Sequence, residues 1–245
     1  MNSITPNLNI MIKACEKASK VIIRDFGEVE NLQLIKKGPR DFVTKTDKRV
    51  EEILINELAK SKKNYSFLTE ESGKIENNDK DEIWVIDPID GTINFLHGVP
   101  HFAISVAHQS EGEIVSGLIF DPIKNEMFYA DKNNGAFFNN HRIRVSKKNN
   151  IEDCLFGTGG KLVKEPDISF RKSGSAALDM AYVAAGRYDG FFQKNLNLWD
   201  IAAGIILVKE AGGIVNDLDL EIYKNIEIIA SSPSINQKLK DEINT

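Results

Sequence analysis

The fold is organised around one stretch, Trp84-Val85-Ile86-Asp87-Pro88-Ile89-Asp90-Gly91-Thr92-Ile93-Asn94-Phe95. The apolar residues Ile83 to Ile86 predict a short buried strand, because a continuous apolar run bounded by turn residues is typical of one. We expect this strand to end at Asp87, since Pro88 has no N–H group for further pairing in a central strand.

Two carboxylates stand at the end of this strand. Asp87 and Asp90 are three residues apart in the sequence, with a proline between them. This arrangement suits Mg²⁺, which binds a few carboxylate oxygens and leaves its other positions to water and substrate phosphate. The Gly91-Thr92 step supplies backbone N–H groups, and a helix N-terminus there would bind an anion. A metal site beside a phosphate site suggests metal-assisted phosphoryl transfer.

Each candidate acid also has a structural explanation. Asp-Pro and Asp-Gly pairs are common turn formers. Asp47 falls in the first turn of one predicted helix and Asp200 opens another, where the helix dipole favours a carboxylate. Glu70 follows a predicted strand at Tyr65–Leu68 and, taken alone, is better explained as part of a solvated turn. The residues alone leave both interpretations open.

Composition places the chain among ordinary soluble globular proteins. Its 245 residues are 42% hydrophobic and 27% charged, with a net charge of −5. This acidic balance gives no general attraction for nucleic acid or for an anionic membrane. Cys15 and Cys154 imply no disulfide framework, and the four histidines show no metal-ligand spacing. No apolar run is long enough to span a membrane and no signal-peptide pattern opens the chain, so the expected location is cytoplasmic.

The order of the predicted elements favours an α+β fold. A helix is expected from Thr5-Pro6, an N-cap followed by proline. Alternating segments from Phe102 onward predict a largely antiparallel meander whose last strand is Ile143–Ser146. Helices and strands mix without a regular βαβ alternation, which favours α+β layers over a doubly wound sheet. Nothing in the sequence resembles a linker, so we expect a single domain over residues 1–245.

Several separated segments resemble one family. Residues 84–97, Trp-Val-Ile-Asp-Pro-Ile-Asp-Gly-Thr-Ile-Asn-Phe-Leu-His, resemble the first signature of the inositol monophosphatase family, and residues 199–213 resemble its second. Thr69-Glu70-Glu71-Ser72 and residues 41–47 fit the two segments that precede the first signature. Residues 174–179 and 184–187 are most similar to the bacterial, SuhB-type branch. The resemblance covers nearly the whole chain.

The resemblance implies a layered α-β-α-β-α sandwich and Mg²⁺-dependent hydrolysis of phosphate monoesters, usually with inhibition by Li⁺. It implies two or three Mg²⁺ ions in each active site. Their ligands would be Glu70, Asp87 and the Ile89 carbonyl for the first ion, Asp87, Asp90 and Asp200 for the second, and Glu70 with waters for a third.

The same resemblance implies roles for residues around the metals. Thr92, hydrogen-bonded to Asp47, would orient the attacking water with help from Glu70. Backbone groups of Gly91 and Thr92 would bind the phosphate. The residues expected along the alcohol side of the substrate are Gly174, Ser175, Ala176 and Gln193.

Two departures from the family pattern bear on the substrate. Gln193 stands where many members carry glutamate, and glutamine loses the charge-assisted part of a hydrogen bond to a substrate hydroxyl. The segment from Thr158 to Arg171 is shorter than in bacterial relatives, and a helix normally found there is expected to be reduced or missing. This affects the substrate rim and a family-like dimer interface.

The expected function is hydrolysis of inositol 1-phosphate, or of a similar small polyol phosphate, by a homodimer that contacts no membrane. An alternative of the same class is a phosphatase for nucleotide 3′-phosphates, fructose bisphosphate or NADP. An alternative of a different class is a SuhB-like regulatory factor with a partner in the transcription machinery, acting on ribosomal RNA synthesis. The basic stretch from Arg142 to Lys148 is the feature that hints at it.

Overall fold

The structure, a computed structural model, describes residues 4–28, 34–38, 41–160 and 167–243. Its first helix begins as the sequence predicts: the Thr5 hydroxyl accepts a hydrogen bond from the Leu8 N–H at 3.3 Å, and Pro6 takes the first helical position. Of the described helices, none is long and apolar enough to cross a membrane. The helices are α1 (Pro6–Phe26), α2 (Lys45–Ser61), α3 (Thr92–Leu96), α4 (Ala176–Ala184), α5 (Leu198–Glu210) and α6 (Asn236–Ile243).

The strands form two larger sheets and a hairpin. The eight-stranded sheet has the order β10-β9-β8-β7-β6-β5-β3-β4, and the five-stranded sheet has the order β12-β11-β13-β15-β14. The hairpin pairs β1 (Leu34–Gly38) with β2 (Asp41–Thr44). The strands of the eight-stranded sheet are β3 (Tyr65–Thr69), β4 (Gly73–Ile75), β5 (Asp79–Asp90), β6 (Ala103–Ser110), β7 (Glu113–Asp121), β8 (Glu126–Asp131), β9 (Gly135–Phe138) and β10 (His141–Arg142). Those of the five-stranded sheet are β11 (Phe156–Thr158), β12 (Phe170–Lys172), β13 (Gly190–Leu196), β14 (Ile214–Val215) and β15 (Ile226–Ser231).

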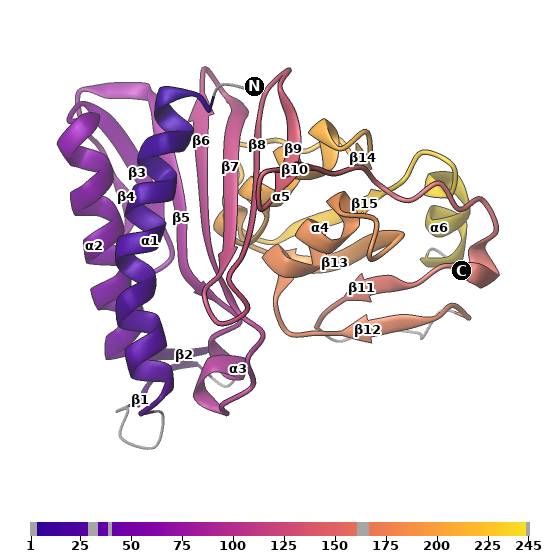
Figure 1. The fold of residues 1–245 in the computed structure, drawn as a ribbon, viewed down its shortest axis with the longest axis horizontal. Helices are drawn as coiled ribbons and strands as arrows, with labels where there is room; N and C mark the ends of the chain where they lie inside the picture. The colour runs from indigo at the N-terminus through magenta and orange to yellow at the C-terminus, as the bar shows by residue number, and fades with distance from the viewer. Residues whose placement is uncertain (1–3, 29–33, 39–40, 161–166, 244–245) are drawn as a thin grey trace.

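Helices and sheets alternate in five layers (Figure 1). Helices α1 and α2 cover one face of the eight-stranded sheet, α4 and α5 lie between the two sheets, and α6 covers the outer face of the smaller sheet. Successive side chains along a strand point to opposite faces of the sheet, so one sheet packs against a helix layer on each face. On β5, Trp84 and Ile86 pack with α1 and α2, while Val85 packs with α4 and α5. The predicted α-β-α-β-α sandwich of the α+β class is confirmed.

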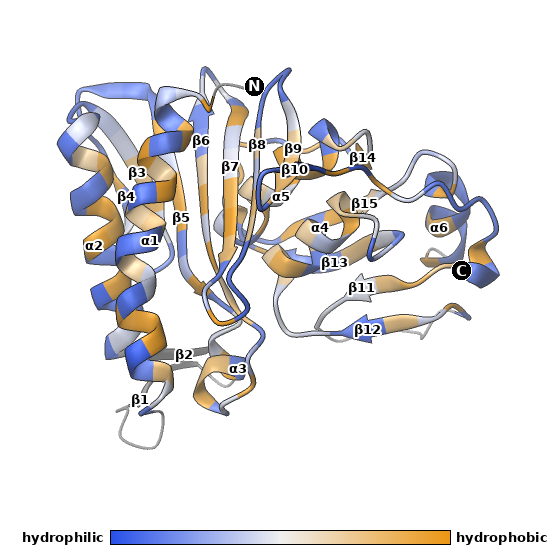
Figure 2. Ribbon diagram, viewed as in Figure 1, coloured by the Kyte–Doolittle hydropathy of each residue, from blue (hydrophilic) through white to orange (hydrophobic). Residues whose placement is uncertain are grey.

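Hydropathy along the outer helices follows the same layering. Figure 2 shows hydrophobic and hydrophilic positions alternating around α1 and α2. Their apolar stripes face the sheet, with Met11, Cys15 and Ile22 from α1 and Leu54 from α2 fully buried. A helix at the surface buries one such stripe and exposes the rest. In contrast, α5 is apolar nearly all round, because it is covered by a sheet on either side.

Two predicted strand boundaries were wrong. Strand β5 does not end at Asp87 but extends to Asp90, with a break in its pairing to β6 between Asp87 and Asp90. This irregularity accommodates Pro88, which cannot donate to the ladder, and pairing resumes at Asp90. The last strand of the meander is His141–Arg142 rather than Ile143–Ser146. The chain leaves the sheet there, and the Val145 N–H bonds instead to the carbonyl of Ala211, which follows α5.

Candidate active site

Five carboxylates come from four parts of the fold. Asp87 and Asp90 lie at the end of β5, and Glu70 lies just after β3. Strands β3 and β5 are parallel neighbours, so their carboxyl ends meet at one edge of the sheet, where the Glu70 N–H donates to the Ile86 carbonyl at 3.2 Å. Asp47 stands in the first turn of α2 and Asp200 in the first turn of α5.

Helix α5 is brought to this edge by a link from β6. Ser105 is the partner of Asp87 in the β5–β6 register. Its hydroxyl donates to the Trp199 carbonyl at 3.4 Å, which places the start of α5 beside Asp87. The carboxylate of Asp200 accepts a hydrogen bond from the Asn197 N–H at 2.7 Å, as a helix-capping acid does. Asp200 is therefore a helix-capping residue, as one interpretation of the sequence predicts. The same hydrogen bond also fixes its carboxylate at this site.

Asp87 is the electrostatic centre of the group. It is 2% exposed, and burial is the main cause that raises its pKa well above the usual value. The negative charges of Glu70, Asp90, Asp200 and Asp47 raise this pKa further. Like charges raise a pKa in this way only at close range. The fold therefore places the other four predicted acids within electrostatic range of Asp87.

Asp90 is held by the start of α4. One of its oxygens, Oδ2, accepts from the Ser175 hydroxyl at 2.5 Å and from the Ala177 N–H at 2.8 Å. Burial raises the pKa of Asp90 to about 6, against the opposing effect of these hydrogen bonds. Ser175 is the N-cap of α4 and accepts from the Leu178 N–H at 3.3 Å, so the same hydroxyl serves the helix and the carboxylate.

The donor set fits a hard divalent cation. In the described part of the chain, no three histidine, cysteine, aspartate or glutamate side chains are already gathered as ligands of one ion. Protein donors orient three of the acids: Asp87 accepts from the Ile89 N–H at 3.0 Å, and Asp90 and Asp200 accept the bonds given above. Each carboxylate has two oxygens and about four acceptor positions, so capacity remains for a metal. Oxygen donors of this kind suit Mg²⁺, and its charge would relieve the repulsion at Asp87.

The two residues predicted to bind phosphate, Gly91 and Thr92, lie at the start of α3. Gly91 has φ of 99°, and a Cβ there would lie 3.1 Å from both the His101 carbonyl oxygen and the Phe102 Cβ. Both the backbone conformation and the close approach therefore require glycine. The Thr92 hydroxyl donates to the Ile89 carbonyl at 3.0 Å. The expected hydrogen bond between Thr92 and Asp47 stays a prediction.

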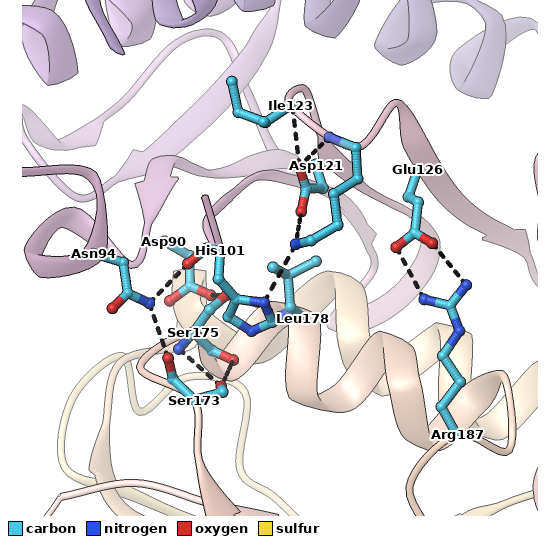
Figure 3. Close-up of polar contacts among 11 residues, drawn as sticks. Asp90, Asn94, His101, Asp121, Ile123, Glu126, Ser173, Ser175, Leu178 and Arg187 are labelled. Carbon is cyan, nitrogen blue, oxygen red and sulfur yellow. Dashed lines mark hydrogen bonds and ion pairs between the residues drawn. The ribbon is translucent and has the colours of Figure 1, made fainter. Parts of the chain in front are cut away.

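Sequence reasoning gave no role to Asn94 or Ser173, which shape the site. The Asn94 amide donates to the His101 carbonyl at 2.7 Å and to the Ser173 carbonyl at 2.9 Å. It thereby ties α3 to the turn that precedes α4, beside Asp90 (Figure 3). Gly174 in this turn has φ of 88°, and a Cβ on it would lie 2.9 Å from the Asn94 amide nitrogen. A sequence signal existed: Asn94 is the first strongly polar side chain after Thr92 in the quoted stretch.

The predicted alcohol-side residues are divided between two elements. Ser175 and Ala176 are buried at the start of α4, and Gly174 is exposed in front of them. Gln193 lies on β13, half-buried, with its amide against Gly159. A Cβ on Gly159 would stand 2.2 Å from the Gln193 Oε1, so the glycine makes room for this side chain. Of the segment predicted to be shortened, residues 161–166 lie outside the described residues.

Similarity to known proteins agrees with this architecture. Residues 4–244 match the sequence profile described as the inositol monophosphatase family. The chain belongs to the inositol monophosphatase family. Its membership confirms the predicted resemblance and the predicted class of enzyme, a phosphatase.

Three relatives place the chain within the family. An inositol-1-monophosphatase of Mesorhizobium japonicum is 43% identical over 95% of this chain and 94% of its own length. The Nus factor SuhB of Escherichia coli is 42% identical over 86% of this chain and 85% of its own length. The crystal structure of the extragenic suppressor protein suhB from Bartonella henselae has a TM-score of 0.92 and 43% identity, and the match covers 98% of this chain and 99% of that one. The SuhB-type resemblance is thus confirmed.

Proposed function

We propose that the protein is a Mg²⁺-dependent phosphatase that hydrolyses inositol 1-phosphate or a closely similar small polyol phosphate. The observation that carries the proposal is the carboxylate group around Asp87: burial, and then the negative charges of four neighbouring acids, raise the pKa of Asp87. A bound cation would offset the repulsion among these acids. Divalent metals held in this way catalyse the hydrolysis of phosphate esters. The relative from Mesorhizobium japonicum is named for the same activity.

The residues would hold two ions and a weaker third. Glu70, Asp87 and the Ile89 carbonyl would bind the first, Asp87, Asp90 and Asp200 the second, and Glu70 with waters the third. When bound, the metal lowers the pKa of a coordinated water and stabilises negative charge on the departing alcohol oxygen. The chain's contribution is to fix these ligands: β5 and β3 hold Asp87 and Glu70 at one edge, and α5 holds Asp200 through its helix cap.

The remaining site residues orient water and substrate. Thr92, with Asp47, would orient the attacking water with help from Glu70. The N–H groups of Gly91 and Thr92 lie at the start of α3, where backbone N–H groups lack partners within the helix, and they would bind a phosphate oxygen. The fixed placement of such donors is the main source of catalysis in phosphoryl transfer. Gly174, Ser175, Ala176 and Gln193 would face the alcohol.

A substrate panel tests this proposal. Phosphate release is measured from inositol 1-phosphate, a nucleoside 3′-phosphate, fructose 1,6-bisphosphate, NADP and p-nitrophenyl phosphate, with Mg²⁺ and with excess chelator. We expect the highest kcat/KM on inositol 1-phosphate and loss of activity in chelator. A higher kcat/KM on one of the other three metabolites would replace the substrate but keep the mechanism. Full activity in chelator would contradict the metal site itself.

A second candidate function rests on the name of a relative. The Escherichia coli protein is named a Nus factor, and an exposed basic stretch from Arg142 to Lys148 is available on this chain. We propose a partner in the transcription machinery as a second role. It is tested by measuring whether RNA polymerase from the same organism retains the protein on a column, and whether Asp90→Asn, which removes hydrolysis, is retained equally. No retention of either protein would exclude the role.

Three further expectations accompany the proposal. We propose a homodimer, which sedimentation equilibrium tests. We propose inhibition by Li⁺, which a titration of LiCl at fixed Mg²⁺ tests against NaCl. The proposed location is the cytoplasm, which fractionation of the source cells tests.

A further inference from the structure

A chain of hydrogen bonds leads from the buried Asp179 of α4 through the half-buried Ser173 to the candidate metal ligand Asp90. The Ser173 hydroxyl donates to Oδ1 of Asp179 at 2.7 Å and accepts from the Ser175 N–H at 3.3 Å. The Ser175 hydroxyl in turn donates to Oδ2 of Asp90 at 2.5 Å. The Asp179 carboxyl group bonds to Ser173, which has no assigned metal or substrate role, while the Asp179 N–H donates to the Ser175 carbonyl at 3.1 Å within the first turn of α4.

We propose that Asp179 is a positioning residue: acting through Ser173 and Ser175, it fixes the orientation of the Asp90 carboxylate toward the metal. This inference rests on the proposed function, because it assigns Asp90 to a metal. Oδ2 of Asp90 is already held by two donors from α4, so its other carboxylate oxygen, Oδ1, is the one that we assign to the ion. Because the Ser175 hydroxyl holds Oδ2, a rotation of the Ser175 side chain would change the orientation of the whole Asp90 carboxylate.

Asp179 has little freedom to move. It lies in the first turn of α4, four residues after the Ser175 N-cap, and is 1% exposed. Apolar contacts often join this helical position to the residues before the N-cap, and here a polar contact to Ser173 takes their place. On the other side lies Gly157 of β11, where a Cβ would stand 2.9 Å from the Asp179 Cγ. The carboxyl group is thus packed closely between α4 and the five-stranded sheet.

The turn that Asp179 holds is fixed on its opposite side by α3. The Asn94 amide donates to the Ser173 carbonyl, while Asp179 accepts from the Ser173 side chain. Figure 3 shows Asn94, Ser173 and Ser175 grouped beside Asp90. Without Asp179, the hydroxyl of Ser173 would turn to the Ser175 carbonyl, already 3.4 Å away. A shorter bond there would draw Ser175, the N-cap of α4, away from its present position beside Asp90.

The protonation of Asp179 decides which substitution is conservative. Burial raises the pKa of Asp179 to about 8, with the Ser173 hydrogen bond opposing the rise and the charge of Asp90 on β5 adding to it. Near pH 7 the group is mainly the neutral acid. Asparagine has the same shape, no charge and an oxygen that accepts from Ser173. Asp179→Asn therefore preserves the contact, while Asp179→Ala and Ser173→Ala remove it.

The test is the affinity for MgCl₂, measured by titration calorimetry at pH 7 in the full chain. We expect the Kd for Mg²⁺ to rise about tenfold in Asp179→Ala and in Ser173→Ala, because changes behind a metal ligand typically cost ten- to a hundredfold in affinity. Asp179→Asn should bind within about twofold of the wild type. The double variant Ser173→Ala/Asp179→Ala should bind no more weakly than the weaker single variant, since both act through one contact.

The matched control is Asp189→Ala. Asp189 is also a buried acid, 2% exposed, but its carboxylate accepts from the Leu155 N–H and from Lys148, away from the turn. This variant should lose stability and keep the wild-type Kd for Mg²⁺. Equal weakening in the control would mean that the effect of Asp179→Ala is general destabilisation, and would overturn the inference.

Two other outcomes would overturn it: wild-type Mg²⁺ affinity in both alanine variants, or an Asp179→Asn variant as weak as Asp179→Ala. If Asp179→Ala fails to fold, Ser173→Ala decides alone, because Ser173 is only half-buried. Failure of the proposed function is separable. A wild type that binds Mg²⁺ but hydrolyses no phosphate ester contradicts the phosphatase assignment while the calorimetry still decides the role of Asp179. A wild type that binds no Mg²⁺ overturns both.

Discussion

Replacing Asp90 by asparagine is expected to stabilise the metal-free protein while removing its activity. Burial raises the pKa of Asp90 to about 6, from an ordinary value of 3.8. Between these two pH values the unfolded chain is ionised and the folded protein is protonated, so the wild type loses stability as pH rises through this window. Asparagine keeps an oxygen that accepts from Ser175 and Ala177 but carries no charge.

The size of the effect follows from the shift. About two pKa units correspond to about 3 kcal/mol at pH 7, since each unit is 1.36 kcal/mol. In a chain of this length, that gain should raise Tm by roughly 6–12 °C. The gain should be near zero at pH 4, grow up to pH 6 and stay constant above it. The sign is opposite to that of most buried substitutions, which destabilise.

The assay is urea unfolding with EDTA from pH 5 to pH 8, followed by the same series with MgCl₂. Added Mg²⁺ should stabilise the wild type by mass action and leave Asp90→Asn nearly unchanged. Hydrolysis by the variant should fall by orders of magnitude. The control is Asp217→Asn, which removes an exposed carboxylate and should change neither property. Destabilisation by Asp90→Asn, or a gain that does not vary with pH, would refute the conclusion that burial raises the pKa of Asp90.

Other predictions address the water and the alcohol side of the substrate. Gln193→Glu should lower KM for inositol 1-phosphate, on the order of tenfold from a restored charged hydrogen bond, with little change in kcat or with p-nitrophenyl phosphate; equal changes on both substrates would remove Gln193 from the alcohol side. Gly159→Ala should displace the Gln193 amide, which lies 2.2 Å from the added Cβ, and raise KM for inositol 1-phosphate; a rise that persists in a Gln193→Ala background would show another cause. Asp47→Asn and Thr92→Ala should each lower kcat, and their combination should be little worse than the worse single variant. Additive losses would make Asp47 a helix cap alone.

Much of the fold was predictable because the sequence patterns agree with the packing. The N-cap at Thr5 begins α1 where expected. Of the apolar run Ile83–Ile86, Trp84 to Ile86 are buried in the sheet as predicted and Ile83 is half-buried. Its side chains point alternately to the two faces of the sheet and pack with a helix layer on each. Pro88 misled the prediction of the strand end, since a break in pairing lets the strand continue past a residue that cannot donate. Local sequence does not show which neighbour will accept such a break.

The acids were singled out from residue type and spacing together with the family resemblance, and the fold places the other four within electrostatic range of Asp87. The residues that position these acids were not predictable from the sequence. Asp179 stands in a helix of small and apolar residues, where its type alone signals a buried polar contact. Its partner, Ser173, is known only once the turn before α4 is built. Asn94 likewise gains its role from the His101 and Ser173 carbonyls, which are distant in sequence from each other.

The central claim is that the carboxylates around Asp87 bind divalent metal. Its most direct test is anomalous diffraction at the manganese edge from crystals soaked in MnCl₂, because Mn²⁺ takes the same oxygen ligands as Mg²⁺. We predict one peak within about 2.0–2.3 Å of oxygens of Glu70, Asp87 and the Ile89 carbonyl, and a second at the same range from Asp87, Asp90 and Asp200. Peaks elsewhere, with none in contact with Asp87, would contradict the claim.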